Sequence, residues 1–125
     1  EGYCRDDSNQ RYSGVQSYYL SSRTDDSYCL DWCSQNPHPD LVGVEVYRFS
    51  YGVYCLCDFS EGVPDGINTT DYTPPAYSLD DDSNGTGAIL ASDGYDYALC
   101  YRYDVRISGV IPVAQILTPL HCISS

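Results

Sequence analysis

The clearest alternation of apolar and polar residues lies between residues 24 and 59. The first part has helical spacing, because its apolar side chains recur three or four positions apart: Tyr28, Cys29, Trp32 and Cys33. Thr24 can cap such a helix, and Asn36-Pro37 ends it. The sequence therefore predicts a short helix that carries two cysteines on one face.

The second part alternates with the period of a β-strand. Residues 41–49 are rich in β-branched and aromatic side chains, and residues 53–59 place three alternate side chains on one face: Cys55, Cys57 and Phe59. The short link Ser50-Tyr51-Gly52 between these segments predicts a β-hairpin.

The two cysteines of each pair are expected to lie nearly the same distance apart. Cys29 and Cys33 would lie ~6 Å apart along a helix, and Cys55 and Cys57 ~6.6 Å apart along a strand. A helix lying on the strand could therefore form two disulfides side by side.

The alternative is a structural zinc site. Such sites usually contain CxxC pairs or cysteine with histidine. Here the pairs are CxxxC and CxC, and only His38 lies near them. The spacings favour disulfides.

This stretch resembles the PAN/apple and WSC modules, two related families of cysteine-rich extracellular domains. In both, a cysteine pair on a short helix precedes a strand and then a second strand with another pair, here YCLDWC and LVGVEVYRFSYGVYCLC. The resemblance implies a small disulfide-rich α+β domain with one helix packed on an antiparallel β-sheet. It also implies the nested pairing of apple modules, which gives Cys29–Cys57, Cys33–Cys55 and Cys4–Cys100.

The remaining chain supplies the flanks of this domain. Residues 11–20 and 95–105 have strand-like composition, whereas Gly, Pro, Asp, Asn, Ser and Thr dominate residues 60–94 and predict a long loop with little regular structure. We therefore expect residues 1–105 to form one disulfide-bonded domain. Residues 106–125 form a nearly uncharged apolar C-terminal tail.

Another surface has to cover this apolar tail. The tail can pack on its own domain or add to the sheet of a neighbouring copy. Cys122 favours the second arrangement, because it is the odd cysteine once the other six are paired. Such a leftover cysteine suggests an intermolecular disulfide.

Composition indicates a secreted glycoprotein of the cell surface or matrix. Seven cysteines in 125 residues are typical of an oxidising compartment, and the sequons at Asn68 and Asn84 lie in turn-rich sequence where N-glycans attach. No apolar run is long enough to span a membrane. The formal charge of −12, without any lysine, disfavours nucleic acid and anionic membranes as partners.

One acidic segment resembles half of a calcium loop. Asp80, Asp82 and Asn84 occupy its first, third and fifth positions, but the bidentate Glu expected at the twelfth is Ala91. Asn84 also belongs to a sequon, so a solvated acidic loop is the favoured interpretation.

Catalysis and cofactors have little support in the sequence. Neither His38 nor His121 has the context of a nucleophile–base pair, and no nucleophile-elbow motif is present. We therefore predict a protein that is not an enzyme and needs no cofactor.

Fourteen tyrosines are the remaining signal. Aromatic rings stack on sugar rings, and the resemblance to WSC modules implies polysaccharide binding. The candidate glycan-binding residues are Tyr18, Tyr19, Tyr47, Tyr51 and Tyr54, although tyrosine also fills half-buried positions of sheets.

The first functional hypothesis is a structural or adhesive subunit of an extracellular matrix or filament, which self-associates through its tail. The alternative is a module that binds cell-wall or matrix polysaccharide.

Overall fold

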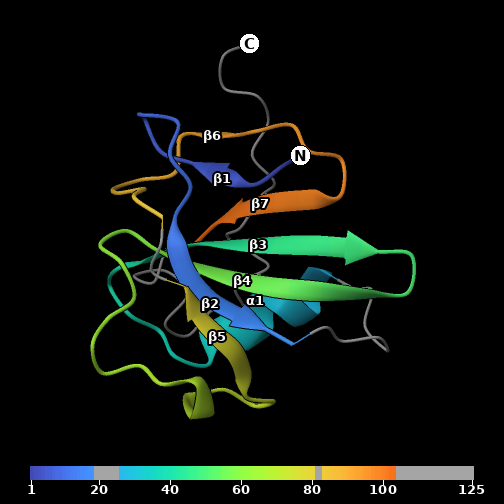
Figure 1. Cartoon of the computed structure of the whole chain (residues 1–125), viewed down its shortest axis with the longest axis vertical. Helices are drawn as coiled ribbons and strands as arrows, with labels where there is room; N and C mark the ends of the chain where they lie inside the picture. Colours follow the sequence, from blue (N-terminus) through green and yellow to red (C-terminus); the bar gives the residue numbers. More distant parts are fainter. Residues whose placement is uncertain (19–25, 81–82, 104–125) are drawn as a thin grey trace.

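The computed structural model describes residues 1–18, 26–80 and 83–103. These residues form a small disulfide-rich α+β domain with an antiparallel five-stranded sheet in the order β5-β2-β4-β3-β7 (Figure 1). Its strands are β2 Ser13–Ser17, β3 Leu41–Phe49, β4 Gly52–Phe59, β5 Ala76–Asp80 and β7 Ala98–Arg102. A second sheet pairs β1 Cys4–Arg5 with β6 Ala91–Ser92. The helical elements are α1 Asp26–Ser34 and a 3-10 helix, Thr69–Asp71.

The predicted helix and hairpin are confirmed. Strands β3 and β4 pair along their whole length, from Leu41 opposite Phe59 to Phe49 opposite Gly52, and leave a two-residue turn. Helix α1 ends at Ser34, ahead of Asn36-Pro37, because the residue before a proline disfavours helical backbone. The predicted cap Thr24 lies outside the described residues.

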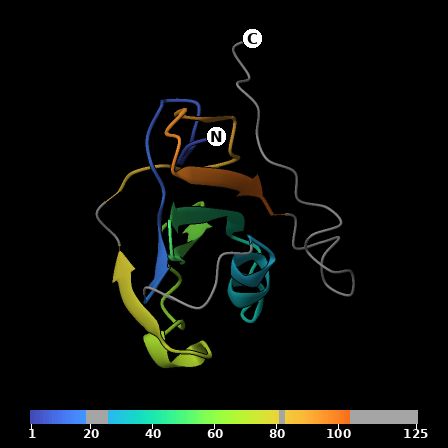
Figure 2. The ribbon, with the colours of Figure 1, turned by 90° about the vertical axis from the view of Figure 1, so that its right-hand side faces the viewer.

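Helix α1 packs on one face of the large sheet (Figure 2). The alternation in β3 and β4 turns Val44, Val46, Cys55 and Cys57 toward the helix, where they are fully buried. Trp32 closes this core from the helix side. Its ring packs against Tyr72 with centroids 4.6 Å apart, and its Nε1 donates a hydrogen bond to the carbonyl oxygen of Pro74 at 2.9 Å.

Three disulfides join the six cysteines of the described residues. Cys4–Cys100 is as predicted, but the helix bonds are Cys29–Cys55 and Cys33–Cys57. The nested pairs implied by the apple-module resemblance, Cys29–Cys57 and Cys33–Cys55, are therefore wrong. The Cα atoms of the two observed helix bonds lie 5.1 and 5.5 Å apart, within the usual range for a disulfide.

The direction of the helix explains this difference. The two observed bonds align α1 with β4, so that both run in the same direction. Strand β3 pairs antiparallel with β4 and therefore runs opposite to α1. The first helical cysteine therefore meets the first strand cysteine, whereas nested pairing requires an antiparallel helix.

The predicted flanks also need correction. Residues 60–94 were expected to be a loop, but they contain the 3-10 helix, β5 and β6. Strand β5 pairs with the edge of β2 through main-chain hydrogen bonds, which do not depend on side-chain composition. The strands expected over residues 11–20 and 95–105 are shorter, since β2 covers Ser13–Ser17 and β7 covers Ala98–Arg102.

The sequence also predicts that the chain has no membrane span and that it ends in an apolar tail. Within the described ranges, no helix has the length and apolar character needed to cross a membrane. The predicted tail at residues 106–125, including Cys122, lies outside the described residues.

Candidate functional site

The face of the large sheet opposite α1 carries the polar and aromatic residues. Its central rows come from alternate positions of β3 and β4, with Glu45 diagonal to Asp58 and Tyr47 directly opposite Tyr54. At one end of this face the N-terminal segment lies across the sheet and forms a small second core of Cys4, Tyr12, Ile89 and Cys100. At the other end the face is open.

The open end is a groove lined by aromatic rings, which we call the tyrosine groove. It has a volume of about 290 Å³ and is lined by Tyr3, Arg11, Gln16, Tyr47, Phe49, Tyr54, Leu56 and Asp80. A shallower extension of about 670 Å³ adds Arg5, Asp93 and Tyr95. The lining thus combines aromatic faces with charged and amide groups, which is the composition of a site for a polar ligand with apolar faces.

The rings of the groove support one another. Tyr3 stacks against Tyr47 and Tyr95 with centroid separations of 6.0 and 5.7 Å. Tyr54 contacts Phe49 edge-on at 5.2 Å and Tyr47 at 6.2 Å. These separations lie in the range of favourable aromatic pairs. Contacts with neighbouring rings therefore restrict the side-chain conformation of each ring.

Arg11 joins the groove to the buried end of the same face. Its guanidinium lies 3.8 Å from the centroid of the Tyr3 ring, a cation–π contact. Its Nη2 also lies 3.4 Å from Oε1 of Glu45. A second arginine, Arg5, forms an ion pair with Asp93 at 3.0 Å. Two of the six arginines of the chain therefore line this one region.

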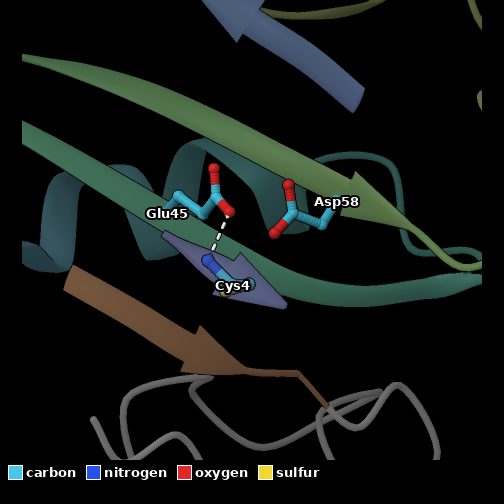
Figure 3. A group of neighbouring side chains, drawn as sticks. All are labelled: Cys4, Glu45 and Asp58. Carbon is cyan, nitrogen blue, oxygen red and sulfur yellow. Dashed lines mark hydrogen bonds between the residues drawn. The ribbon is translucent and has the colours of Figure 1, made fainter. Parts of the chain in front are cut away.

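Glu45 and Asp58 are both almost fully buried and point toward one another between the sheet and β1 (Figure 3). Oε2 of Glu45 accepts a hydrogen bond from the backbone N–H of Cys4 at 2.7 Å. The two carboxyl groups lie close together, in a cluster whose ligand atoms are all within 4.8 Å of one another. Because Cys4 is bonded to Cys100, Glu45 helps to hold the N-terminal segment on the sheet.

Burial disfavours the charged form of both acids. It raises the pKa of Glu45, although Arg11 and the N–H of Cys4 oppose the shift. Burial and the neighbouring Glu45 raise the pKa of Asp58 well above its usual range. Asp58 therefore holds a proton more readily than Glu45, and Arg11 lies beside Glu45 to balance its charge.

These two acids and Cys4 form a cluster whose potential metal-binding atoms lie within 4.8 Å of one another. The geometry fits a metal poorly. The sulfur of Cys4 is committed to a disulfide, and an arginine and an N–H group already face Glu45. Oδ2 of Asp58 has no hydrogen-bond partner in the described part of the chain, and protonation of this carboxyl group lowers the cost of burying it.

The structure brings together only part of the predicted glycan-binding set. Tyr47 and Tyr54 line the groove. Tyr51 lies at the tip of the hairpin, near Phe49. Tyr18 follows β2 and contacts Tyr77, but it does not line the groove. Tyr19 lies outside the described residues.

Sequence reasoning missed most of the residues that line the groove, including Tyr3, Arg11, Phe49 and Tyr95. Phe49 has the same parity as Tyr47 on β3, so strand alternation alone could have identified it. The others come from segments far away in sequence, and the predicted Cys4–Cys100 bond was the one signal that placed Tyr3 near β7.

The other predicted sites can be placed only in part. The sequon residues Asn68 and Asn84 are both exposed. Of the weak calcium candidates, Asp80 is exposed at the end of β5 and Asn84 lies in the following loop, while Asp82 is outside the described residues. His38 accepts a hydrogen bond from the backbone N–H of Asp40 through Nδ1 at 3.0 Å.

Comparisons with known proteins give no relative: no family model, no curated protein and no solved structure matches this chain. The resemblance to PAN/apple and WSC modules therefore stays a prediction.

Proposed function

We propose that this chain is a secreted carbohydrate-binding module that holds a polysaccharide in the tyrosine groove. The observation that carries the proposal is the groove itself, where partly exposed rings of Tyr3, Tyr47 and Tyr54 lie beside the polar groups of Arg11 and Gln16. Sugar rings offer apolar C–H faces to aromatic rings and hydroxyls to such polar groups.

The extracellular location is part of the proposal. Three disulfides are typical of a protein from an oxidising compartment. The exposure of both sequon residues, Asn68 and Asn84, is compatible with glycans at these positions. Neither sequon asparagine lines the groove, so glycans there leave it open.

A glycan array followed by calorimetric titration with the best polysaccharide tests the proposal. Replacing Tyr54 by alanine removes a ring from the groove, and we expect at least about a tenfold loss of affinity, equivalent to about 1.4 kcal/mol. Tyr77→Ala is the matched control, because Tyr77 is an exposed tyrosine of β5 that does not line the groove. Absence of binding to every glycan, or equal losses in both variants, would reject it.

Self-association is a second candidate function, and one observation favours it. The three disulfides pair all six cysteines of the described residues with each other, so Cys122 has none of them as its partner. An intermolecular Cys122 bond would join copies into a structural or adhesive assembly of the matrix. Non-reducing electrophoresis of the wild type and Cys122→Ser tests this, and a monomer with a free thiol contradicts it.

A further inference from the structure

Tyr95 is the centre of a group of tyrosines at the shallow end of the groove. Its ring stacks on Tyr3, contacts Tyr97 at 5.6 Å, and lies 6.0 Å from the ring of Tyr47. Tyr95 and Tyr97 are 42% and 60% exposed, so a reagent in solution can reach both. Sugar binding does not require that three phenols meet around a fourth.

The contact between Tyr47 and Tyr95 differs from the others in the group. The two hydroxyl oxygens lie 3.5 Å apart, and the ring planes are inclined by 32°. The carbons next to the C–OH carbon, where the unpaired electron of a phenoxyl radical is concentrated, therefore lie at the facing ends of the rings. Tyr3 and Tyr95 instead stack nearly parallel, at 13°.

The rest of the chain offers few other groups that give up an electron easily. There is no methionine, and the single tryptophan, Trp32, is 2% exposed. The six described cysteines are already oxidised to disulfides. Methionine and free thiols are the usual first targets of oxidants, so their scarcity leaves exposed tyrosine as the main target.

We propose that Tyr47 and Tyr95 form an oxidative cross-linking site, at which hydrogen peroxide and a peroxidase convert the two phenols into a dityrosine. Each phenol loses one electron and one proton, and the two radicals combine through a new carbon–carbon bond between ortho positions. Each coupled carbon then loses its hydrogen to the neighbouring oxygen, which restores both phenols. Overall, two tyrosines and one hydrogen peroxide give one dityrosine and two water molecules.

The local chemistry fits a stepwise loss of electron and proton. The hydrogen bond with Tyr47 raises the pKa of Tyr95, so this phenol keeps its proton at neutral pH. The neighbouring hydroxyl of Tyr47 lies within reach to take part in the proton transfer. Tyr97, the more exposed ring, can pass an oxidising equivalent to Tyr95 through their contact.

The dityrosine cross-link would restrict the movement of one segment of the domain. Tyr47 lies on β3, which is held between β4 and β7, and Tyr95 precedes β7. A bond between residues 48 positions apart would fasten the segment before β7 to the sheet. It would also fix one wall of the groove, because Tyr3 stacks on both tyrosines.

The test treats the full chain with peroxidase and hydrogen peroxide, then measures dityrosine fluorescence of the monomer and maps cross-linked peptides by mass spectrometry. The background is Cys122→Ser, so that a thiol cannot consume radicals. We expect a peptide pair that joins Tyr47 to Tyr95 with the loss of two hydrogen atoms. The variants Tyr95→Phe and Tyr47→Phe should each lose this pair and most of the monomer fluorescence.

Tyr51→Phe is the matched control, since Tyr51 is 63% exposed and its ring contacts Phe49, which is not a phenol. It should retain the cross-link. A cross-link mapped to Tyr3–Tyr95 or to other tyrosines, or monomer fluorescence that survives in Tyr95→Phe, would overturn the assignment. Circular dichroism and mapping of the three disulfides establish that each variant is folded. No glycan enters this test, so its result is independent of the proposed sugar binding.

Discussion

The two faces of the large sheet use alternate residues of the same strands, yet they are held in different ways. Toward α1, Val44 and Cys55 belong to a dry core that two disulfides fasten to the helix. Away from α1, Glu45 and Asp58 are buried acids, and their face continues into a partly open groove. Position along a strand therefore decides whether a residue serves stability or chemistry.

This difference separates what is fixed from what can be adjusted. Apolar packing and disulfides respond little to pH, so the helix face should keep its structure over a wide range of conditions. The opposite face depends on the protonation of its buried acids and on Arg11, which contacts both Glu45 and Tyr3. Substitutions on the helix face should therefore change the free energy of unfolding by a similar amount at every pH. Substitutions on the opposite face should change how the free energy of unfolding depends on pH.

The largest expected effect comes from removing a helix disulfide. The variant Cys29→Ala/Cys55→Ala loses a bond between residues 26 positions apart. Its free energy of unfolding should fall by about 2–5 kcal/mol, because the unfolded chain regains freedom. Denaturant titrations at several pH values should give a similar loss at each. Unchanged stability, or a wild-type peptide map with Cys29 bonded to Cys57, would contradict the structure.

The second effect comes from Asp58→Asn on the opposite face. Both acids have raised pKa values in the folded protein, so the folded state binds more protons than the unfolded chain above the ordinary carboxyl range of about 4. Stability should be greatest below that range and should fall as pH rises through the folded-state pKa. The asparagine amide can replace the protonated acid, so the variant should gain about 1–3 kcal/mol at neutral to alkaline pH.

Asp31→Asn is the control for this experiment, because Asp31 is an exposed acid of α1. It should leave the slope of stability against pH unchanged. Asp6 acts in the opposite direction: burial acts to raise its pKa, but hydrogen bonds from backbone N–H groups outweigh burial and lower it. The contribution of Asp6 to stability is lost as pH falls. The two variants, Asp58→Asn and Asp31→Asn, should therefore be compared above about pH 5. A steeper slope of stability against pH in Asp58→Asn would refute the raised pKa of Asp58.

Much of the helix face could be predicted from sequence, but the direction of the helix relative to β4 could not. The nearly equal spacing within the two cysteine pairs is a local property of helix and strand, and it correctly placed α1 on β4. The nested pairing failed because it was carried over from a resemblance. The order of one helix and two strands is shared with modules whose cysteines nest, so only the structure shows that Cys29 meets Cys55.

The opposite face was harder to predict because its residues come from distant segments. Alternation puts Glu45 and Asp58 on the face away from the cysteines, but their burial depends on β1, which crosses the sheet. Strand β5 was missed because prolines and acidic residues flank it, although its pairing with β2 needs only main-chain groups. Nothing local indicates that Tyr95 lies beside Tyr47.

The third effect comes from Arg11→Gln, which removes the positive charge beside Glu45. The arginine side chain is more than a third exposed, so solvent weakens its ion pair, and we expect a loss of about 1 kcal/mol at neutral pH. The loss should shrink in acid, where Glu45 is protonated and no longer needs a counter-charge. Thermal unfolding measured at several pH values checks this. A loss that is the same in acid would show that Arg11 acts through packing on Tyr3.

The smallest effect is expected from the corresponding arginine of the helix face. Arg48 on β3 forms an ion pair with Asp26 in the first turn of α1, but it is largely exposed. Arg48→Gln should therefore cost less than about 1 kcal/mol and should lose most of that effect in high salt. The same unfolding series as for Arg11→Gln makes the two arginines directly comparable. If Arg48→Gln proved the more costly and the more pH-dependent of the two, ionisable groups would matter most at the helix face, and the contrast between the two faces would fail.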